Sequence, residues 1–449
     1  MSSESFNGVT TASKSTQINF IAFWVGQLFS LFGSSVVFFS VFIYFAELTK
    51  DNPNQGTIFT TVSAIIAIPF TLVLFFSGVF IDRWNRKKII IISDAVQAIS
   101  TLVLVVLFML GYINSWPTNL YVIAGIFMIR QVAQGFHGPA IQAIIPLMIP
   151  KEKISRFNGI NTFVSSAVHI VGPIFSGFLI GLGLDFTQIL WIDVITFLIA
   201  LMPAILITIP PHKLKTIVKE EKSSYIQEFK EGFRTIMNIR GMPALFLVII
   251  VLNTLSQPYG QLQAIFFQKI AGDNYYNLLA YNGIFFQVAI LLGGGIMMLR
   301  KKWKRKALLI IGTQFFGILA WFLIALAGFS FPYWLVYIAT SLTGLYASIY
   351  NTTYQTIFHE TIPPDKLGRV FSVDYAISFF LGPVATLASG PIADWLGIQN
   401  LYLGIAIFAA IFMTLMVIFS DYRFVGKDTL EKPIEERNIK ELPDSIKTP

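Results

Sequence analysis

The sequence Ile149-Pro150-Lys151-Glu152-Lys153-Ile154-Ser155-Arg156 occurs again 213 residues later, as Ile362-Pro363-Pro364-Asp365-Lys366-Leu367-Gly368-Arg369. The same offset relates Ser176-Gly177 to Ser389-Gly390. In a strongly apolar chain, such an internal repeat indicates two similar membrane halves. Carriers whose central site alternates between the two faces of a bilayer are built in this way.

The composition is that of a membrane protein. Hydrophobic residues make up 55% of the chain, charged residues make up 12%, and the mean hydropathy is +0.68, which excludes an ordinary soluble domain. The absence of Cys excludes disulfides, Cys-ligated zinc and thiol redox chemistry. Residues 1–17 are polar and lack the short basic and then apolar segments of a cleaved signal peptide. The first apolar run, 18–46, is therefore expected to be a signal anchor that is retained in the mature protein.

Because a membrane helix needs about 20 apolar residues, the hydrophobic runs predict an all-α membrane protein with twelve transmembrane helices in two pseudo-symmetric six-helix halves. The halves are expected at 18–209 and 241–420, separated by a middle loop at 210–240 and flanked by tails at 1–17 and 421–449. The predicted spans are 18–46, 57–81, 89–111, 119–148, 157–182, 187–209, 241–268, 277–299, 306–328, 332–358, 370–393 and 399–420.

Lys and Arg residues gather on one face of this predicted topology. If both termini lie on the same side, the opposite face receives only Lys50 and Lys269. The positive-inside rule therefore predicts that both termini and the middle loop lie in the cytoplasm. The plasma membrane is the expected location. The net charge of +8 and the pI near 9.4 follow from this bias, so no nucleic-acid partner is required.

The middle loop is predicted to contain one amphipathic helix. Apolar and small residues recur there at helical spacing between charged ones, at Tyr225, Phe229, Gly232, Phe233 and Ile236. This helix is expected to lie on the cytoplasmic face and to join the two halves. A regulatory domain is less expected, because about 30 residues cannot bury a core of their own.

The loop between spans 2 and 3 reads Gly78-Val79-Phe80-Ile81-Asp82-Arg83-Trp84-Asn85-Arg86-Lys87-Lys88. Lipid anchoring explains its basic residues, but it does not explain a glycine and a carboxylate one turn apart. The loop resembles the major facilitator superfamily signature Gly-x-Leu-x-Asp-Arg-x-Gly-Arg-Arg/Lys, and it departs from that signature at Phe80 and Asn85. The resemblance implies the fold of that superfamily and a cytoplasmic gate that contains Gly78, Asp82, Arg83 and Arg86. The second half has Leu299 where Asp82 would fall, so the halves are not expected to be functionally equal.

Span 4 places a basic residue deep in the bilayer. Counted at 1.5 Å per residue from the outer end, Arg130 lies ~16 Å down, close to the midplane. Gln134 and His137 follow on the same stripe. Exposure of the charge to lipid would cost at least about 2.5 kcal/mol, so Arg130 must face partners or water. The stripe is interpreted either as a structural interhelical pair or as the wall of a proton-coupled transport cavity. It resembles the superfamily's Arg-x-x-Gln-Gly signature, with Gln134-Gly135 one residue late.

Span 5 contains Gly172-Pro173 and, four residues further, Gly177. Small residues allow close helix packing, and Pro173 bends the helix. The segment resembles the Gly-Pro-x-x-Gly-Gly signature of exporters in the superfamily, with Ser176 replacing the first Gly of the closing pair, and this resemblance favours efflux over uptake. His169, at mid-depth in the same span, is a further protonatable candidate.

A longer resemblance covers about 18–420. The run Phe136-His137-Gly138-Pro139-Ala140-Ile141-Gln142-Ala143-Ile144-Ile145-Pro146-Leu147-Met148-Ile149-Pro150 looks like the end of span 4 in the macrolide-efflux (Mef-type) branch. Trp191-Ile192-Asp193-Val194-Ile195-Thr196-Phe197-Leu198-Ile199 and Glu231-Gly232-Phe233-Arg234 fit that branch as well. Siderophore exporters share the branch, so the substrate does not follow from this resemblance.

Three further carboxylates lie within predicted spans. Asp94 and Asp374 are about two turns inside the cytoplasmic ends of spans 3 and 11, and they are expected to form gate pairs with Arg83, Arg86 or Arg369. Asp193 has no evident basic partner. It is interpreted either as a proton carrier or as a carboxylate held by a hydroxyl or a helix cap.

Neutral amides recur at positions expected to line a central cavity: Gln27, Asn161, Asn253, Gln257 and Gln261. Pro258-Tyr259-Gly260 is expected to break span 7. Amides with many aromatics and few fixed charges favour a bulky amphiphile over a sugar phosphate or an amino acid. Packing bonds between helices are an equally open interpretation of each amide.

The leading hypothesis is a proton-coupled antiporter that exports hydrophobic or amphiphilic small molecules by alternating access, with macrolide-like drugs implied by the resemblance. The alternatives are an uptake symporter, a siderophore- or lipid-type carrier, and a membrane protein that transports nothing. An enzyme is not expected, because the sequence has no Gly-Lys-Ser/Thr nucleotide loop, no His/Glu metal spacing and no credible nucleophile triad. No cofactor, nucleotide or metal is expected, only a proton gradient, and the carrier is expected to be a monomer in the lipid bilayer.

Overall fold

The structure is a computed structural model, and it describes residues 14–113, 116–209, 225–299, 305–329 and 332–425. These residues form α-helices and two short 3₁₀-helices, and no strand occurs among them. The chain divides into two compact units, Met1–Val218 and Lys219–Pro449. The predicted all-α membrane fold is confirmed.

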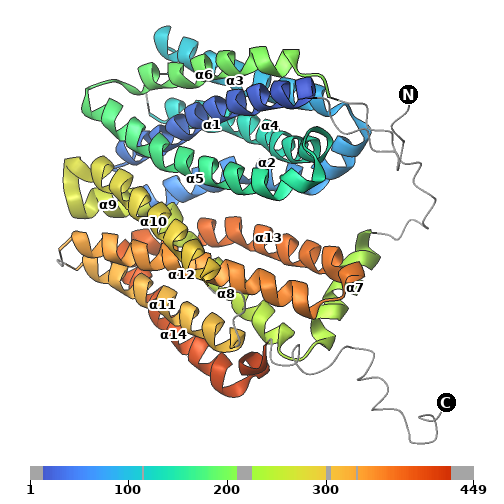
Figure 1. Cartoon of the computed structure of the whole chain (residues 1–449). Coiled ribbons are helices and arrows are strands. Elements are labelled where there is room, and N and C mark those ends of the chain that lie inside the picture. Colours follow the sequence, from blue (N-terminus) through green and yellow to red (C-terminus); the bar gives the residue numbers. More distant parts are fainter. Residues whose placement is uncertain (1–13, 114–115, 210–224, 300–304, 330–331, 426–449) are drawn as a thin grey trace, which may run out of the picture. The chain divides into compact units, whose positions relative to one another are not determined.

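The first unit consists of six helices, α1 (Lys14–Leu48), α2 (Gln55–Arg83), α3 (Arg86–Met109), α4 (Thr118–Met148), α5 (Lys151–Gly181) and α6 (Phe186–Leu206) (Figure 1). Helix α1 packs against α5 and α6, α2 packs against α4, and α3 lies against α4 and α6. Side chains fix two of the helix starts. The Asn85 side chain accepts from the Lys88 amide at α3, and Asp185 and Gln188 form a capping box at α6.

The second unit begins with the short helix α7 (Tyr225–Asn238) and continues with α8 (Met242–Gln261), α9 (Gln263–Ala271), η1 (Gly272–Asn274), α10 (Tyr275–Met298), α11 (Lys306–Ala327), α12 (Trp334–Thr361), α13 (Pro364–Leu396), α14 (Ile398–Phe419) and η2 (Asp421–Phe424). Helix α12 packs against α10 and α11, and α13 packs against α7 and α8. Within this unit, α7 approaches α13 closely, because a Cβ on Gly232 would lie 2.5 Å from the Arg369 carbonyl oxygen.

The repeated motif has the same local structure in each unit. Pro150 (φ −56°, ψ 142°) precedes α5, and Pro363 (φ −55°, ψ 139°) precedes α13. The preceding residues, Ile149 and Ile362, are both extended and end α4 and α12. Because proline fixes φ near −65° and donates no hydrogen bond, it sets the start of the next helix in both places.

Nine helices in the described part are long and apolar enough to cross a membrane. Three further helices, α4, α12 and α13, have 31, 28 and 33 residues and contain more polar side chains. Their length suffices for a bilayer about 30 Å thick, since each residue adds about 1.5 Å. Twelve spans therefore stays the prediction.

The predicted position of the break in span 7 is wrong. Helix α8 continues through Pro258, Tyr259 and Gly260, and it ends at Leu262, which separates α8 from α9. Pro258 removes only its own N–H donor, whereas its carbonyl still accepts from the Leu262 amide at 2.9 Å. The helix therefore survives the proline and breaks one turn later.

Candidate functional site

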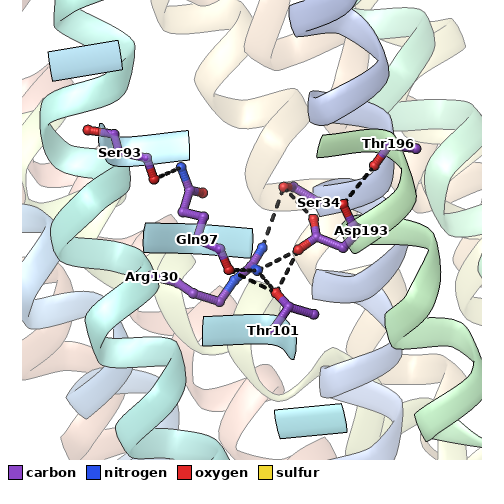
Figure 2. A network of polar contacts seen from close by, with 7 residues as sticks. All are labelled: Ser34, Ser93, Gln97, Thr101, Arg130, Asp193 and Thr196. Carbon is purple, nitrogen blue, oxygen red and sulfur yellow. Dashed lines mark hydrogen bonds and ion pairs between the residues drawn. The ribbon is translucent and has the colours of Figure 1, made fainter. Parts of the chain in front are cut away.

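Arg130 lies on α4 in the interior of the first unit, and 6% of its surface is exposed. Its guanidinium forms an ion pair with Asp193 of α6, with 2.5 Å between Nη1 and Oδ2 (Figure 2). Nη1 also donates to the Gln97 carbonyl oxygen of α3 at 3.0 Å and to the Thr101 hydroxyl. The expectation that Asp193 has no basic partner is therefore wrong. Packing of α3 against both α4 and α6 brings together residues that are 63 positions apart.

The Asp193 carboxylate accepts from two hydroxyl groups in addition to the guanidinium. Ser34 of α1 donates to Oδ1 at 2.9 Å, and Thr101 donates to Oδ2 at 2.7 Å. The Phe127 ring centroid lies 5.4 Å from the guanidinium carbon of Arg130. We call Arg130, Asp193, Thr101 and Ser34 the arginine layer. Because both charges are paired and hydrogen-bonded, this buried layer is compatible with an apolar surrounding.

A second polar group lies further along the same helices. His137 Nε2 of α4 is 2.9 Å from Asp94 Oδ1 of α3 and 3.0 Å from Gln27 Oε1 of α1. Gln27 Nε2 donates to Asp94 Oδ2 at 2.9 Å. We call these three residues the histidine layer. Its Asp94–His137 contact becomes an ion pair only when the imidazole carries a proton.

The predicted gate pair of Asp94 with a loop arginine is wrong. The carboxylate, 2% exposed, faces α1 and α4 instead of the loop. Arg86 donates to the Ala143 carbonyl oxygen at 2.9 Å. Depth along α3 was read correctly from the sequence, but the direction in which the carboxylate points depends on how α3 packs.

The two layers repeat at a spacing of seven residues on three helices. Gln27 and Ser34 lie on α1, Asp94 and Thr101 on α3, and Arg130 and His137 on α4. Seven residues make about two turns, or about 10.5 Å, so each helix contributes one residue to each layer. Sequence reasoning missed Thr101 and Gln97. The seven-residue distance from Asp94 is the signal that could have identified Thr101.

The other residues predicted in this unit lie apart from the two layers. Gln134 is half-buried on α4 between Arg130 and His137, and His169 is exposed on α5. Asn161 accepts from the Trp24 indole at 2.7 Å. The surroundings of the predicted gate residues Gly78, Asp82 and Arg83 lie outside the described part, so their gate role stays a prediction.

The exporter-like motif forms a close helix contact in this unit. A Cβ on Gly172 would lie 2.7 Å from Cβ of Ser35 on α1, which no real pair of side chains tolerates. One turn further, the Ser176 and Ser40 hydroxyls are 2.6 Å apart. Pro173 is half-buried and Gly177 is buried. The segment therefore provides the surface on which α5 packs against α1.

Replacing Gly172 by Ala should destabilise the protein by about 1–3 kcal/mol, because the methyl group meets Ser35. Thermal unfolding in detergent measures this loss. Gly181→Ala is the matched control, because a Cβ at Gly181 on the same helix has open space around it. Adding Ser35→Gly to Gly172→Ala should recover part of the lost stability, and equal stability of both single variants would disprove the contact.

The predicted pair of Asp374 with Arg369 is also wrong. In the second unit, Arg369 forms an ion pair with Glu231 of α7 at 2.5 Å. Asp374 instead accepts from the Tyr354 hydroxyl of α12 at 2.6 Å. The docking of α7 onto the beginning of α13 explains the difference, since it offers Arg369 a nearer carboxylate.

The second unit also contains a cavity of about 400 Å³. Its lining is neutral and aromatic, and it includes the predicted residue Asn253 but neither Gln257 nor Gln261. Three stacked rings form one wall. The ring centroid of Tyr259 is 4.3 Å from that of Tyr402 and 5.2 Å from that of Trp321. Asn253, Asn282 and Asn351 provide amides in the same cavity.

Within the described residues, no group of three or more His, Asp or Glu side chains is arranged to hold a metal ion. The charged and titratable groups of the two layers are instead bonded within the layers. The arrangement can hold or release protons at buried carboxylates and at an imidazole, next to a fixed guanidinium charge.

A family model described as the Major Facilitator Superfamily matches residues 23–383 and 283–442. The chain is 26% identical to macrolide efflux protein A of Streptococcus pyogenes, over 86% of this chain and 92% of that protein. It is 27% identical to macrolide efflux protein A of Enterococcus faecalis, over 68% and 92% of the two chains. It is 21% identical to the multidrug efflux pump Tap of Mycobacterium tuberculosis (strain ATCC 25618 / H37Rv), over 77% and 81%.

Solved structures resemble the fold. The nucleoside transporter NupG has a TM-score of 0.65 at 15% identity, covering 89% of this chain and 97% of that chain. A bacterial homologue of the iron transporter ferroportin, in an inward-facing state, also has a TM-score of 0.65 at 15% identity, covering 90% and 99%.

Proposed function

Because the chain belongs to the major facilitator superfamily, we propose that it is a secondary active transporter that exports amphiphilic small molecules in exchange for protons. The chain is a multi-pass membrane transporter of small molecules, and its predicted resemblance to the macrolide-efflux branch is confirmed. Proton exchange, operation in the cell membrane as a monomer, cytoplasmic termini and the gate at Asp82 and Arg83 belong to the proposal.

The single observation that carries proton coupling is the buried ion pair of Arg130 and Asp193. While Asp193 is ionised, it holds Arg130, Ser34 and Thr101, and thereby joins α1, α3, α4 and α6. Protonation of Asp193 removes the negative charge that balances the positive charge of the Arg130 guanidinium. A buried guanidinium without a counter-charge is strongly unfavourable, so protonation favours a conformation in which Arg130 meets water or another acceptor.

The histidine layer supports a route for that proton. The contact between His137 and Asp94 is a hydrogen bond to a carboxylate while the imidazole is neutral, and it becomes an ion pair when the imidazole is protonated. Gln27 of α1 hydrogen-bonds both Asp94 and His137, so a change in the protonation of either group alters a contact of α1. A proton that leaves Asp193 can pass to this layer, two turns along the same helices.

The neutral cavity of the second unit supports the substrate class. Its aromatic wall offers a large apolar surface, and its amides offer hydrogen bonds at fixed points. None of the residues that line it carries a formal charge. Such a cavity suits a bulky amphiphile, which agrees with the macrolide and multidrug names of the relatives.

Proteoliposomes test the proposal directly. An antiporter should accumulate a labelled macrolide when the lumen is acidic, and an uncoupler should abolish the accumulation. A proton symporter requires an alkaline lumen instead, so the sign of the gradient separates export from uptake. Accumulation that is insensitive to the pH gradient and to the uncoupler would refute proton coupling.

A further inference from the structure

Buried polar atoms without a hydrogen-bond partner concentrate at one place in the second unit. Six such side-chain atoms occur among the described residues. Two of them, the Tyr350 hydroxyl and Asp374 Oδ1, belong to one polar cluster, in which the Tyr422 hydroxyl and the Gln314 amide lie close enough to interact with each other. The Tyr350 ring lies against the rings of Tyr346 and Tyr354, and the Tyr354 hydroxyl contacts the Asp374 carboxylate, so these groups form one cluster. Because more than about 90% of buried polar groups are normally bonded, this concentration calls for a functional explanation.

Three tyrosines connect this cluster to the cavity. Tyr346, Tyr350 and Tyr354 follow one another on α12 at a spacing of four residues, and they share one helix face. The ring centroids are 5.6 Å apart for the first pair and 6.1 Å apart for the second. Tyr346 and Tyr350 line the cavity, and the Tyr354 hydroxyl donates to Asp374 Oδ2 at 2.6 Å. Hydroxyl groups therefore lead from the cavity wall to a carboxyl group over about 12 Å of helix.

Asp374 lacks the support that the other two buried carboxylates have. It is 6% exposed, its Oδ2 accepts from Tyr354, and its Oδ1 has no partner among the described side chains. Asp193, in contrast, is bonded by a guanidinium and two hydroxyls. An ionised, buried carboxylate with a single donor is unfavourable, whereas the protonated acid is neutral.

Several charged groups on the neighbouring elements are paired with residues other than Asp374. Arg369, on the same helix as Asp374, pairs with Glu231 of α7, and Asp421 of η2 pairs with Arg240. Helices α8 and α14 contain no charged residue. On α12, Glu360 pairs with Lys306, and the His359 ring faces Phe371. Thus, within the described part of this unit, no cation contacts Asp374.

We propose that Asp374 is a second proton-binding site of the transporter, loaded from the cavity through the hydroxyls of Tyr350 and Tyr354. Each hydroxyl donates one proton to the next group and receives one from the group before it, and water from the cavity bridges successive groups. The tyrosines are therefore unchanged at the end, and the Asp374 carboxylate has become a neutral acid. This proposal rests on the proposed proton exchange and adds its location in the second unit. Because Tyr346 and Tyr350 also line the cavity, a bound substrate covers the start of the path. Substrate and proton then exclude each other, as exchange requires.

Infrared difference spectroscopy tests the site without any substrate. In a pH titration of the reconstituted protein, a protonated carboxyl group gives a carbonyl stretching band, and Asp374→Asn should remove one such band. Tyr354→Phe should shift that band to higher frequency, because the carboxyl group loses a hydrogen bond. Asp421→Asn, which alters a carboxylate of an exposed pair in the same unit, should leave the band unchanged. A full set of bands in Asp374→Asn would overturn the proposal.

Transport supplies the second arm of the test. Asp374→Asn should lower pH-driven macrolide accumulation about 100-fold, with exchange between labelled and unlabelled macrolide retained. Thermal unfolding identifies a variant that fails to fold, in which case Tyr354→Phe decides the outcome. A lost band with unchanged accumulation would refute a role in exchange. If the wild-type protein shows no pH-driven accumulation, the proposed function fails, while the infrared band still decides whether Asp374 binds a proton.

Discussion

Arg130→Met should abolish uphill transport driven by a pH gradient, with a fall in flux of at least about 100-fold. The substitution also leaves Asp193 buried with only two hydroxyl donors, which should cost about 3–5 kcal/mol of stability. Macrolide accumulation in proteoliposomes and thermal unfolding of the purified protein measure the two effects separately. Arg130→Lys should recover only part of the transport, because a point charge cannot reproduce the several directed bonds of a guanidinium.

A double variant distinguishes a coupling role from a structural one. Asp193→Asn combined with Arg130→Met removes both charges, so it should regain much of the lost stability without regaining transport. Arg240→Met is the matched control, since its pair with Asp421 is exposed and worth at most about 1 kcal/mol. Wild-type uphill flux in Arg130→Met would mean that the arginine is only a structural partner.

His137→Gln should flatten the pH dependence of transport and lower the maximal flux about tenfold. Glutamine can still bond Asp94 and Gln27, but it cannot alternate between a neutral and a charged form. Flux measured across a range of pH at a constant pH gradient checks the expectation.

His169→Gln is the control that the structure itself supplies. Both histidines lie within predicted spans and looked equally suited to carry a proton, but His169 is exposed on α5 whereas His137 contacts a buried carboxylate. The His169 variant should therefore keep the wild-type pH profile. The interpretation of the histidine layer is wrong if both variants behave alike.

The sequence predicted helices well because each hydrophobic run has the length that a bilayer demands. The burial of Arg130 within its helix bundle, its place on one helix with His137 and the amphipathic helix at Tyr225 could all be predicted from spacing. What a residue touches could not be read in this way. The sequence predicts no basic partner for Asp193, because nothing in its own span indicates that α6 packs beside α3.

The misplaced carboxylates have one common physical reason. Asp94 and Asp374 lie about two to three turns from the starts of α3 and α13, and such a position follows from counting along a helix. The direction of a side chain follows from the rotation of its helix against the neighbouring helices. Packing turns Asp94 towards His137 and Asp374 towards Tyr354. The tyrosines of α12 are evenly spaced in the sequence, but aromatic residues at helical spacing most often form ordinary core.

The seven-residue spacing in α1, α3 and α4 has a mechanical consequence. Seven residues fall short of two full turns by only about 20°, so both polar positions of a helix point in nearly the same direction. If α1 turns about its axis by one residue, about 100°, it withdraws Gln27 and Ser34 together. Such a rotation would loosen both layers at once, because Gln27 and Ser34 lie on one continuous helix. A single movement of α1 would therefore release its contacts in both layers.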